Sequence, residues 1–147
     1  MSILIADNIR SLHNVGAFFR TCDGLSVDQI FLCGTTGKPP RKEITKTALG
    51  AEEVIPWKYF EYTADAVMYA KKEGCTILAL EVTKESKNIR EYRVPQDWAL
   101  VVGHEIMGVG DDILKMCDEV ISIPMHGVKQ SFNVSVATGI ALFALTE

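Results

Sequence analysis

The segment that decides the fold class is Leu100-Val101-Val102-Gly103-His104-Glu105-Ile106-Met107-Gly108-Val109-Gly110. Its first residues continue an apolar run that predicts a strand over residues 98–102. An unbroken apolar run is typical of a strand whose two faces are both covered by helices. The glycines that follow predict a turn at the end of this strand, before a short helix that begins at Asp111 and ends near Cys117. The segment therefore favours an α/β domain with a mostly parallel sheet.

The same alternation of strands and helices extends in both directions along the chain. Further strands are expected over residues 3–6, 29–33, 53–57, 76–82 and 120–123. Three more helices are expected: one over residues 15–24 capped by Asn14, one capped by Thr63 that ends at Gly74, and one over residues 131–145. The polar segments 34–45 and 83–94 are expected to be long loops, which often carry function.

The composition indicates one globular domain over residues 1–147. Apolar residues make up 48% of the chain and charged residues 23%, and the formal net charge is −4. Such a chain buries enough apolar surface to offset the entropy cost of folding, which excludes a disordered protein. The longest apolar stretch, residues 134–145, is too short to cross a bilayer, so no membrane segment is expected.

The cysteine and histidine positions argue against a disulfide scaffold and against a metal site. The cysteines, at positions 22, 33, 75 and 117, form no C-x-x-C pair and are expected to be buried thiols of a cytoplasmic protein. The chain does not open with the basic and apolar regions of a secretion signal. His104 and Glu105 begin like a zinc-protease motif, but Gly108 stands where the second histidine ligand belongs. No metal is therefore expected.

The acidic balance, 15 basic against 19 acidic residues, argues against a protein that coats nucleic acid over its whole surface. Residues 38–46 depart from that average, because they contain only one acidic residue beside Lys38, Arg41, Lys42 and Lys46. We expect this segment to contact RNA phosphates; the alternative is a solvated surface loop.

Polar residues gather in three segments where a strand leads into a helix, which is where α/β proteins bind ligands. The first is Asn14-Val15-Gly16-Ala17-Phe18-Phe19-Arg20-Thr21. It offers a helix N-terminus to an anion, or is only a capped helix with a surface arginine. The second reads G-x-E-x-x-G from Gly103. Because Glu105 would repel a pyrophosphate, this segment favours an adenosine-like ligand with little phosphate over a dinucleotide; a glycine turn with a solvated glutamate is the alternative.

The third segment is Ile123-Pro124-Met125-His126-Gly127-Val128-Lys129-Gln130-Ser131-Phe132-Asn133-Val134-Ser135-Val136-Ala137. Its polar residues Ser131, Asn133 and Ser135 exceed what one helix cap requires, and buried polar groups need partners. The helix that follows is apolar on nearly every face. Such a helix is buried all round, so we expect one side of it to meet a second copy of the chain in a homodimer.

Taken in this order, N-x-G-A-x-x-R-T, V-x-G-x-E-x-x-G and I-P-M-x-G-x-x-x-S-F-N-V-S-V-A resemble the three motifs of the SpoU family, the RNA ribose 2′-O-methyltransferases of the SPOUT class. The resemblance runs from Asn14 to the C-terminal helix. It implies an α/β sheet whose C-terminal segment is threaded into a deep trefoil knot, against the general rule for protein chains. It also implies a dimer with the cofactor site at its interface. Since the first motif already begins at Asn14, no separate RNA-binding domain is expected.

The resemblance implies S-adenosylmethionine as the cofactor. Its binding residues would be Gly103, Ile123 and Phe132, with contributions from Leu80 and Ser131. Family members often have leucine at the position of Phe132, a change that preserves an apolar wall and narrows the pocket.

The family's catalytic arginine falls on Arg20, with Asn14, Glu105, Ser131 and Asn133 around it. A guanidinium is always protonated in ordinary conditions. We therefore favour a cationic role for Arg20, toward a flanking phosphate or the developing alkoxide, over that of a general base. Glu105 or a phosphate oxygen would then accept the proton.

The expected substrate is tRNA, with rRNA as the other possibility. A non-catalytic knotted protein that binds RNA or assists assembly is the main alternative, and the presence of Arg20, Glu105 and Asn133 argues against it. A small-molecule-binding α/β protein of the nucleotide type is a third reading, which the lack of a phosphate-binding loop disfavours.

Overall fold

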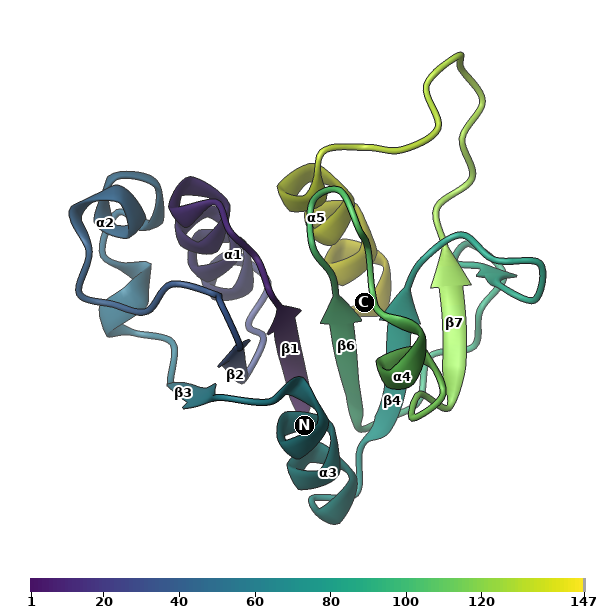
Figure 1. Ribbon diagram of the computed structural model, residues 1–147, viewed down its shortest axis with the longest axis horizontal. Coiled ribbons are helices and arrows are strands. Elements are labelled where there is room, and N and C mark those ends of the chain that lie inside the picture. Colours follow the sequence, from purple (N-terminus) through teal and green to yellow (C-terminus); the bar gives the residue numbers. More distant parts are fainter. Residues whose placement is uncertain (147) are drawn as a thin grey trace.

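The computed structural model describes residues 1–146, and these form one sheet with helices on both faces (Figure 1). Its seven strands lie in the order β3-β2-β1-β6-β4-β7-β5. Each pair of neighbouring strands is parallel. The strands are β1 (Ser2–Asp7), β2 (Gln29–Cys33), β3 (Trp57–Phe60), β4 (Thr76–Leu80), β5 (Lys87–Asn88), β6 (Trp98–Val102) and β7 (Glu119–Ser122). The expected α/β class with a parallel sheet is confirmed.

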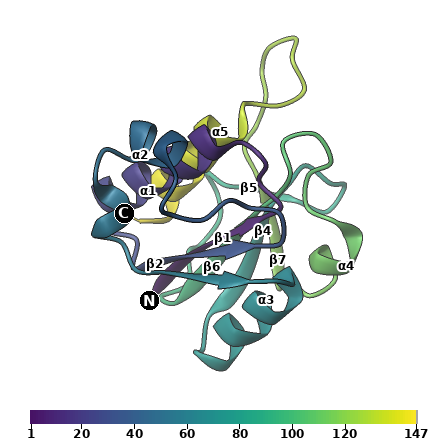
Figure 2. The ribbon, with the colours of Figure 1, turned by 60° about the vertical axis from the view of Figure 1, so that its left-hand side comes forward.

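The helices divide into two layers (Figure 2). One face carries α1 (Leu12–Gly24), α2 (Lys42–Ala48) and α5 (Val134–Leu145), and the other carries α3 (Thr63–Lys72) and the short α4 (Asp111–Leu114). Side chains along β6 alternate between the layers: Leu100 packs into the core beneath α1 and α5, and its neighbour Val101 packs beneath α3 and α4. Both faces are apolar, which explains the unbroken apolar run in the sequence.

Five of the six expected strands are present. Strands β2 and β6 have the expected bounds, and β1, β4 and β7 differ from expectation by one or two residues at their ends. The strand expected over residues 53–57 is wrong. Residues Ala51–Glu53 form a 3₁₀ helix and the strand is Trp57–Phe60. Ile55 is buried, but Pro56 follows it and has no N–H for a ladder, so pairing with β2 begins only after the proline.

Three helices begin at residues other than those expected. Helix α1 starts at Leu12, because the Ser11 hydroxyl caps it by accepting from the Asn14 backbone N–H at 3.2 Å. Asn14 is thus inside the helix. Thr63 is the first residue of α3 rather than its cap, and its hydroxyl donates to Asp7. Helix α5 starts at Val134, three residues later than expected, with Asn133 as its cap.

The two segments expected to be loops each contain a regular element. Segment 34–45 runs into helix α2, which buries Ile44 and Ala48 against α1. A Cβ at Gly16 of α1 would lie only 2.3 Å from the Ile44 carbonyl oxygen, so glycine permits this close packing. Segment 83–94 contains β5, which pairs with β7. Most residues of both segments are polar, so nothing in the sequence marked the few positions that are buried.

Helix α5 is buried on one side only within a single chain. Ala141, Leu142 and Leu145 enter the core, where the helix packs beside α1 (Figure 2). Val136, Ile140 and Phe143 are exposed. The loop between β7 and α5 extends away from the sheet before the helix returns to it (Figure 1).

Candidate functional site

A pocket of about 170 Å³ lies at the carboxyl ends of β4, β6 and β7. Its wall comes from the residues that end or follow these strands, together with the start of α5. The five residues expected to bind the cofactor all belong to this wall: Leu80, Gly103, Ile123, Ser131 and Phe132. Segments far apart in the sequence thus form one concave site, as the topology of parallel sheets favours.

Gly103 is buried between the pocket and the turn that follows β6. A Cβ at this position would lie 2.4 Å from both the Gly108 carbonyl carbon and the Val109 nitrogen. Only glycine allows the turn to fold back this closely, and the turn in turn shapes the pocket.

Glu81 is a pocket residue that sequence reasoning missed. Its Oε2 accepts the Val109 backbone N–H at 3.0 Å and holds the far end of the same turn against β4. Gly108 has a φ of 69°, and a Cβ there would lie 2.4 Å from Glu81 Oε2. The available signal was a carboxylate directly after an apolar strand, at the edge where the other site residues gather.

Glu105 connects the turn to the start of α1. Its Oε1 accepts the Arg10 backbone N–H at 3.2 Å, and its Oε2 accepts the Ser11 backbone N–H at 2.9 Å and the Asn14 side-chain amide at 3.4 Å. Partial burial acts to raise the pKa of Glu105, but these hydrogen bonds outweigh it and the pKa is lowered. The ionised carboxylate therefore joins the first and second sequence motifs.

Arg20 and Asn133 occupy different places from the pocket residues. Arg20 is exposed on α1, and Asn133 caps α5 by accepting the Ser135 N–H at 2.9 Å. Within residues 1–146, the pocket wall includes neither of them, nor Asn14. Of the five expected catalytic residues, a single chain brings Glu105 and Ser131 to the pocket and links Asn14 to it through Glu105.

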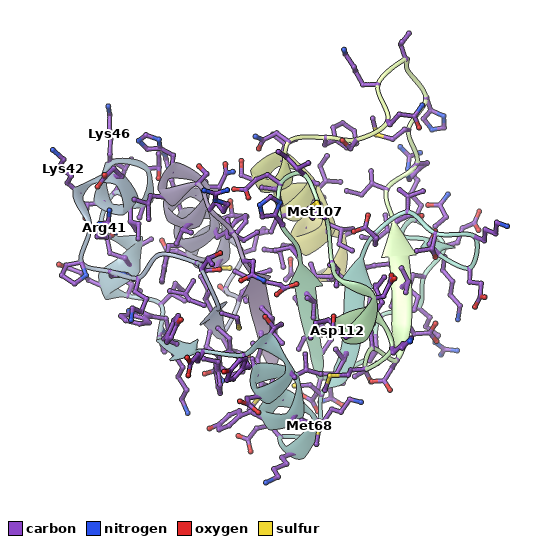
Figure 3. All side chains as sticks on the ribbon, in the orientation of Figure 1. Arg41, Lys42, Lys46, Met68, Met107 and Asp112 are labelled. Carbon is purple, nitrogen blue, oxygen red and sulfur yellow. The ribbon has the colours of Figure 1, made fainter. Side chains whose placement is uncertain are left out.

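The basic segment is half loop and half helix. The Lys38 ammonium lies 4.1 Å from the centre of the Tyr59 ring, and Arg41 pairs with Glu43 at 3.9 Å. Lys42 and Lys46 lie one turn apart on α2, and Figure 3 shows both side chains pointing away from the body of the molecule. These two lysines are the ones most available to a phosphate.

Four cysteines are free thiols in the described residues. Burial raises the pKa of Cys33 to about 12 and that of Cys117 to about 11, so neither is a ready nucleophile. Residues 1–146 contain no group of three or more His, Cys, Asp or Glu side chains placed to hold a metal ion. None of the helices in that range is long and apolar enough to span a membrane.

Several known proteins are similar to this chain in sequence. A tRNA (guanosine(18)-2′-O)-methyltransferase of Aquifex aeolicus is 36% identical over 143 residues, which cover 96% of this chain and 66% of that protein. A 23S rRNA (guanosine-2′-O-)-methyltransferase of Neisseria meningitidis is 31% identical over 95% of this chain and 56% of its own length. This chain therefore spans less than two thirds of either relative.

Solved structures are also similar to this chain. The A. aeolicus tRNA modifying enzyme superimposes with a TM-score of 0.89 at 34% identity, covering 99% of this chain and 73% of that one. An AdoMet-bound rRNA methyltransferase from Sinorhizobium meliloti superimposes with a TM-score of 0.91 at 26% identity, over 98% of this chain and 55% of that one. The model of the SpoU rRNA Methylase family matches residues 1–143, from the first strand to the last helix. The chain belongs to the SpoU rRNA Methylase family.

Proposed function

We propose that this chain transfers a methyl group from S-adenosylmethionine to the 2′-hydroxyl of a ribose in RNA. The observation that carries the proposal is the pocket where Leu80, Gly103, Ile123, Ser131 and Phe132 meet. The names of the tRNA and rRNA relatives and the AdoMet-bound structure from S. meliloti support it.

The chemistry of the pocket suits this cofactor. Leu80, Ile123 and Phe132 provide apolar surface for an adenine ring, and Ser131 provides a hydroxyl. The carboxylates of Glu81 and Glu105 at the wall favour a cationic sulfonium by their charge. When bound, the cofactor supplies an electrophilic methyl group.

The protein residues have the task of positioning the ribose and stabilising negative charge on its oxygen. We assign the second task to Arg20, because a guanidinium remains protonated and can neutralise a developing alkoxide or hold the flanking phosphate. Both oxygens of Glu105 already accept hydrogen bonds, so we assign it an orienting role toward Asn14 rather than that of proton acceptor. A phosphate oxygen of the RNA then accepts the proton. We assign Ser131 and Asn133 to further polar contacts with the ribose.

We propose a homodimer in which a second copy completes the site. Arg20 is not part of the pocket wall of its own chain. The exposed apolar face of α5 consists of Val136, Ile140 and Phe143, and the last two line another hollow together with Ile123 and Phe132 of the pocket wall. Burial of this apolar face against its symmetry mate would stabilise the pair and bring a partner's α1 near the site.

We propose further that the C-terminal segment forms a trefoil knot, as membership of the SpoU rRNA Methylase family implies. A knot leaves a mechanical signature. When the chain is pulled by its two ends, its final length should be less than about 3.3–3.6 Å per residue, because a tightened knot keeps some residues out of the extended length. Full extension would contradict it.

For the substrate we propose tRNA, bound through Lys38, Arg41, Lys42 and Lys46, with rRNA as the second candidate. Two relatives named as tRNA (guanosine(18)-2′-O)-methyltransferases match at 36% and 32% identity, and the rRNA relatives match at 31% and 30%. The free thiols and an RNA substrate fit a cytoplasmic location.

Incubation with methyl-labelled S-adenosylmethionine and separated tRNA and rRNA, followed by digestion to nucleosides, tests this function. The expected product is a labelled 2′-O-methylnucleoside in the tRNA fraction. Label confined to rRNA would reassign the substrate. Absence of transfer to either RNA, with S-adenosylmethionine binding intact, would favour a non-catalytic RNA-binding protein.

A further inference from the structure

A second cavity, of about 910 Å³, opens at the same edge of the sheet. Its wall comes from the ends of β1, β2 and β3, the first residues of α3, and the turn between β6 and α4. His104 and Gly108 of that turn line this cavity and the cofactor pocket alike. The turn between β6 and α4 therefore separates this cavity from the cofactor pocket. Figure 3 labels Met107 on this turn and Asp112 on α4.

Asp7, the last residue of β1, is the buried carboxylate among the residues that line this cavity. Its side chain is only 5% exposed. Oδ1 accepts from the Thr63 hydroxyl and, at 3.3 Å, from the Asn8 amide. Oδ2 has no hydrogen-bond partner among residues 1–146. Burial raises the pKa of Asp7, and a donor supplied by a ligand would favour the ionised form and satisfy the free oxygen.

Exposed side chains suited to a flat ring line the same cavity. Tyr62 is 65% exposed and Met107 is 80% exposed, although both are large and apolar. Aromatic faces are the usual stacking surface for unpaired RNA bases, and thioethers contact aromatic rings favourably.

The charges of the cavity favour a neutral group that donates hydrogen bonds. Asp7, Glu61 and Asp112 line it, against Arg10 and His104. His104 Nδ1 accepts the backbone N–H groups of Ile106 and Met107, each at 3.1 Å, so its proton sits on Nε2 in the neutral form. The excess of carboxylates disfavours a phosphate here.

We propose that this cavity receives the base of the target nucleotide, that this base is guanine, and that Asp7 Oδ2 accepts from its Watson–Crick edge. Guanine presents two adjacent donors on this edge, N1–H and the exocyclic amine, whereas adenine presents only its N6 amine, beside an N1 acceptor that a carboxylate repels. The ribose of a base held here faces the turn that borders the cofactor pocket. Asp7 is thus a specificity-determining residue; the inference rests on the proposed methyl transfer.

Binding of free nucleotides tests the cavity without any mutation. GMP and AMP are titrated separately into the full chain, and backbone amide shifts are followed by NMR. GMP should shift the amides of Gly34, Thr35 and Gly110, with affinity about 10-fold or more above that of AMP, the discrimination typical of a good base-edge contact. Shifts elsewhere, or equal affinities, would overturn the assignment.

The variant Asp7→Asn tests the residue. It keeps the shape of the side chain but places an amide donor where the free oxygen was, so the GMP preference should fall to about one. Asp65→Asn is the matched control, because Asp65 is exposed on α3 and outside the cavity wall. It should retain the preference. A purely structural role for Asp7 would instead weaken both nucleotides equally.

Methyl transfer distinguishes a failure of this inference from a failure of the proposed function. With labelled S-adenosylmethionine and total RNA, the wild type should label guanosine, and Asp7→Asn should lose at least about 10-fold of that rate while binding the cofactor normally. An active wild type with an unchanged Asp7→Asn product profile overturns the role of Asp7 alone. If the wild type methylates no RNA, the proposed function fails, and with it this assignment of the cavity.

Discussion

The carboxylate of Glu105 accepts the backbone N–H of Ser11 at 2.9 Å, across 94 positions of sequence. The same oxygen also accepts a hydrogen bond from the Asn14 side-chain amide, so Glu105 holds the turn after β6 against the first turn of α1. A negative charge at a helix N-terminus interacts favourably with the helix dipole. The contact makes the geometry of the first two motifs depend on one ionised side chain.

Acid should weaken this connection. The lowered pKa of Glu105 means that its contribution to stability is complete above the unfolded-state value, about 4.3, and is lost as pH falls through the folded value. Urea unfolding at pH 7 and at pH 3 should therefore show a smaller acid-induced loss for Glu105→Gln than for the wild type. Glu85→Gln, in an exposed turn, is the control. Identical losses in Glu105→Gln and the wild type would contradict the prediction.

Gly103→Ala should impair cofactor binding. The added methyl group collides with the backbone of Gly108 and Val109, at a cost of about 1–3 kcal/mol typical of overpacking, and displaces the turn that lines the pocket. Calorimetry should show S-adenosylmethionine affinity reduced by about 10-fold or more. Gly24→Ala adds its Cβ in open space and should leave affinity unchanged. Normal affinity in Gly103→Ala would place the cofactor elsewhere.

Arg20→Ala should lower the rate of methyl transfer without lowering the affinity for S-adenosylmethionine. Loss of a charge that stabilises the alkoxide typically costs about 10²–10³ in rate, and Arg20 is not part of the pocket wall. Single-turnover methylation should fall by that factor, with nearly unchanged S-adenosylmethionine affinity. Arg93→Ala, another exposed arginine, should be close to wild type. Parallel loss of rate and cofactor affinity would make Arg20 a structural residue.

The double variant Lys42→Ala/Lys46→Ala should weaken RNA binding and its dependence on salt. Both ammonium groups point outward from α2 (Figure 3). If each meets a phosphate, the slope of log affinity against log salt should fall by roughly 1–2. Lys71→Ala/Lys72→Ala, at the end of α3 on the opposite face, removes equal charge and serves as the control. An unaltered slope would move the RNA site away from α2.

Phe143→Asp should convert the proposed dimer to a monomer, since it places a charge on the exposed apolar face of α5. Sedimentation velocity at matched concentrations measures the outcome. Val54→Asp alters an exposed apolar residue beside the 3₁₀ helix and should remain dimeric. A wild type that sediments as a monomer would remove the dimer proposal itself.

The sequence predicted the bounds of a strand best where both faces of that strand are buried. Strands β2 and β6 are buried along their full length or nearly so, and their apolar runs marked both ends. Prediction failed at edge strand β3, where Lys58 and Tyr59 are exposed, no residue is fully buried, and pairing with β2 starts only after Pro56. It also failed at α2, whose core contact rests on Ile44 and Ala48 alone.

For the site, the motifs and the family resemblance named Leu80, Gly103, Ile123, Ser131 and Phe132, and the fold brings these five residues to one pocket. The motifs could not identify Glu81 or Asp7, because each is a single carboxylate after an apolar strand, with nothing in its neighbours to mark it. The contact of Glu81 with Val109 spans 28 positions, and the hydroxyl that reaches Asp7 comes from 56 positions away. Such partners become visible only when strands are placed side by side.

The interior position of β1 in the sheet has a consequence for synthesis on the ribosome. Strand β1 can pair with β2 early, but its other edge is completed by β6, where Ser2 lies opposite Trp98. Two thirds of the chain must therefore leave the exit tunnel while an apolar strand edge remains open. The nascent chain, rather than the finished protein, is the form most in need of a chaperone.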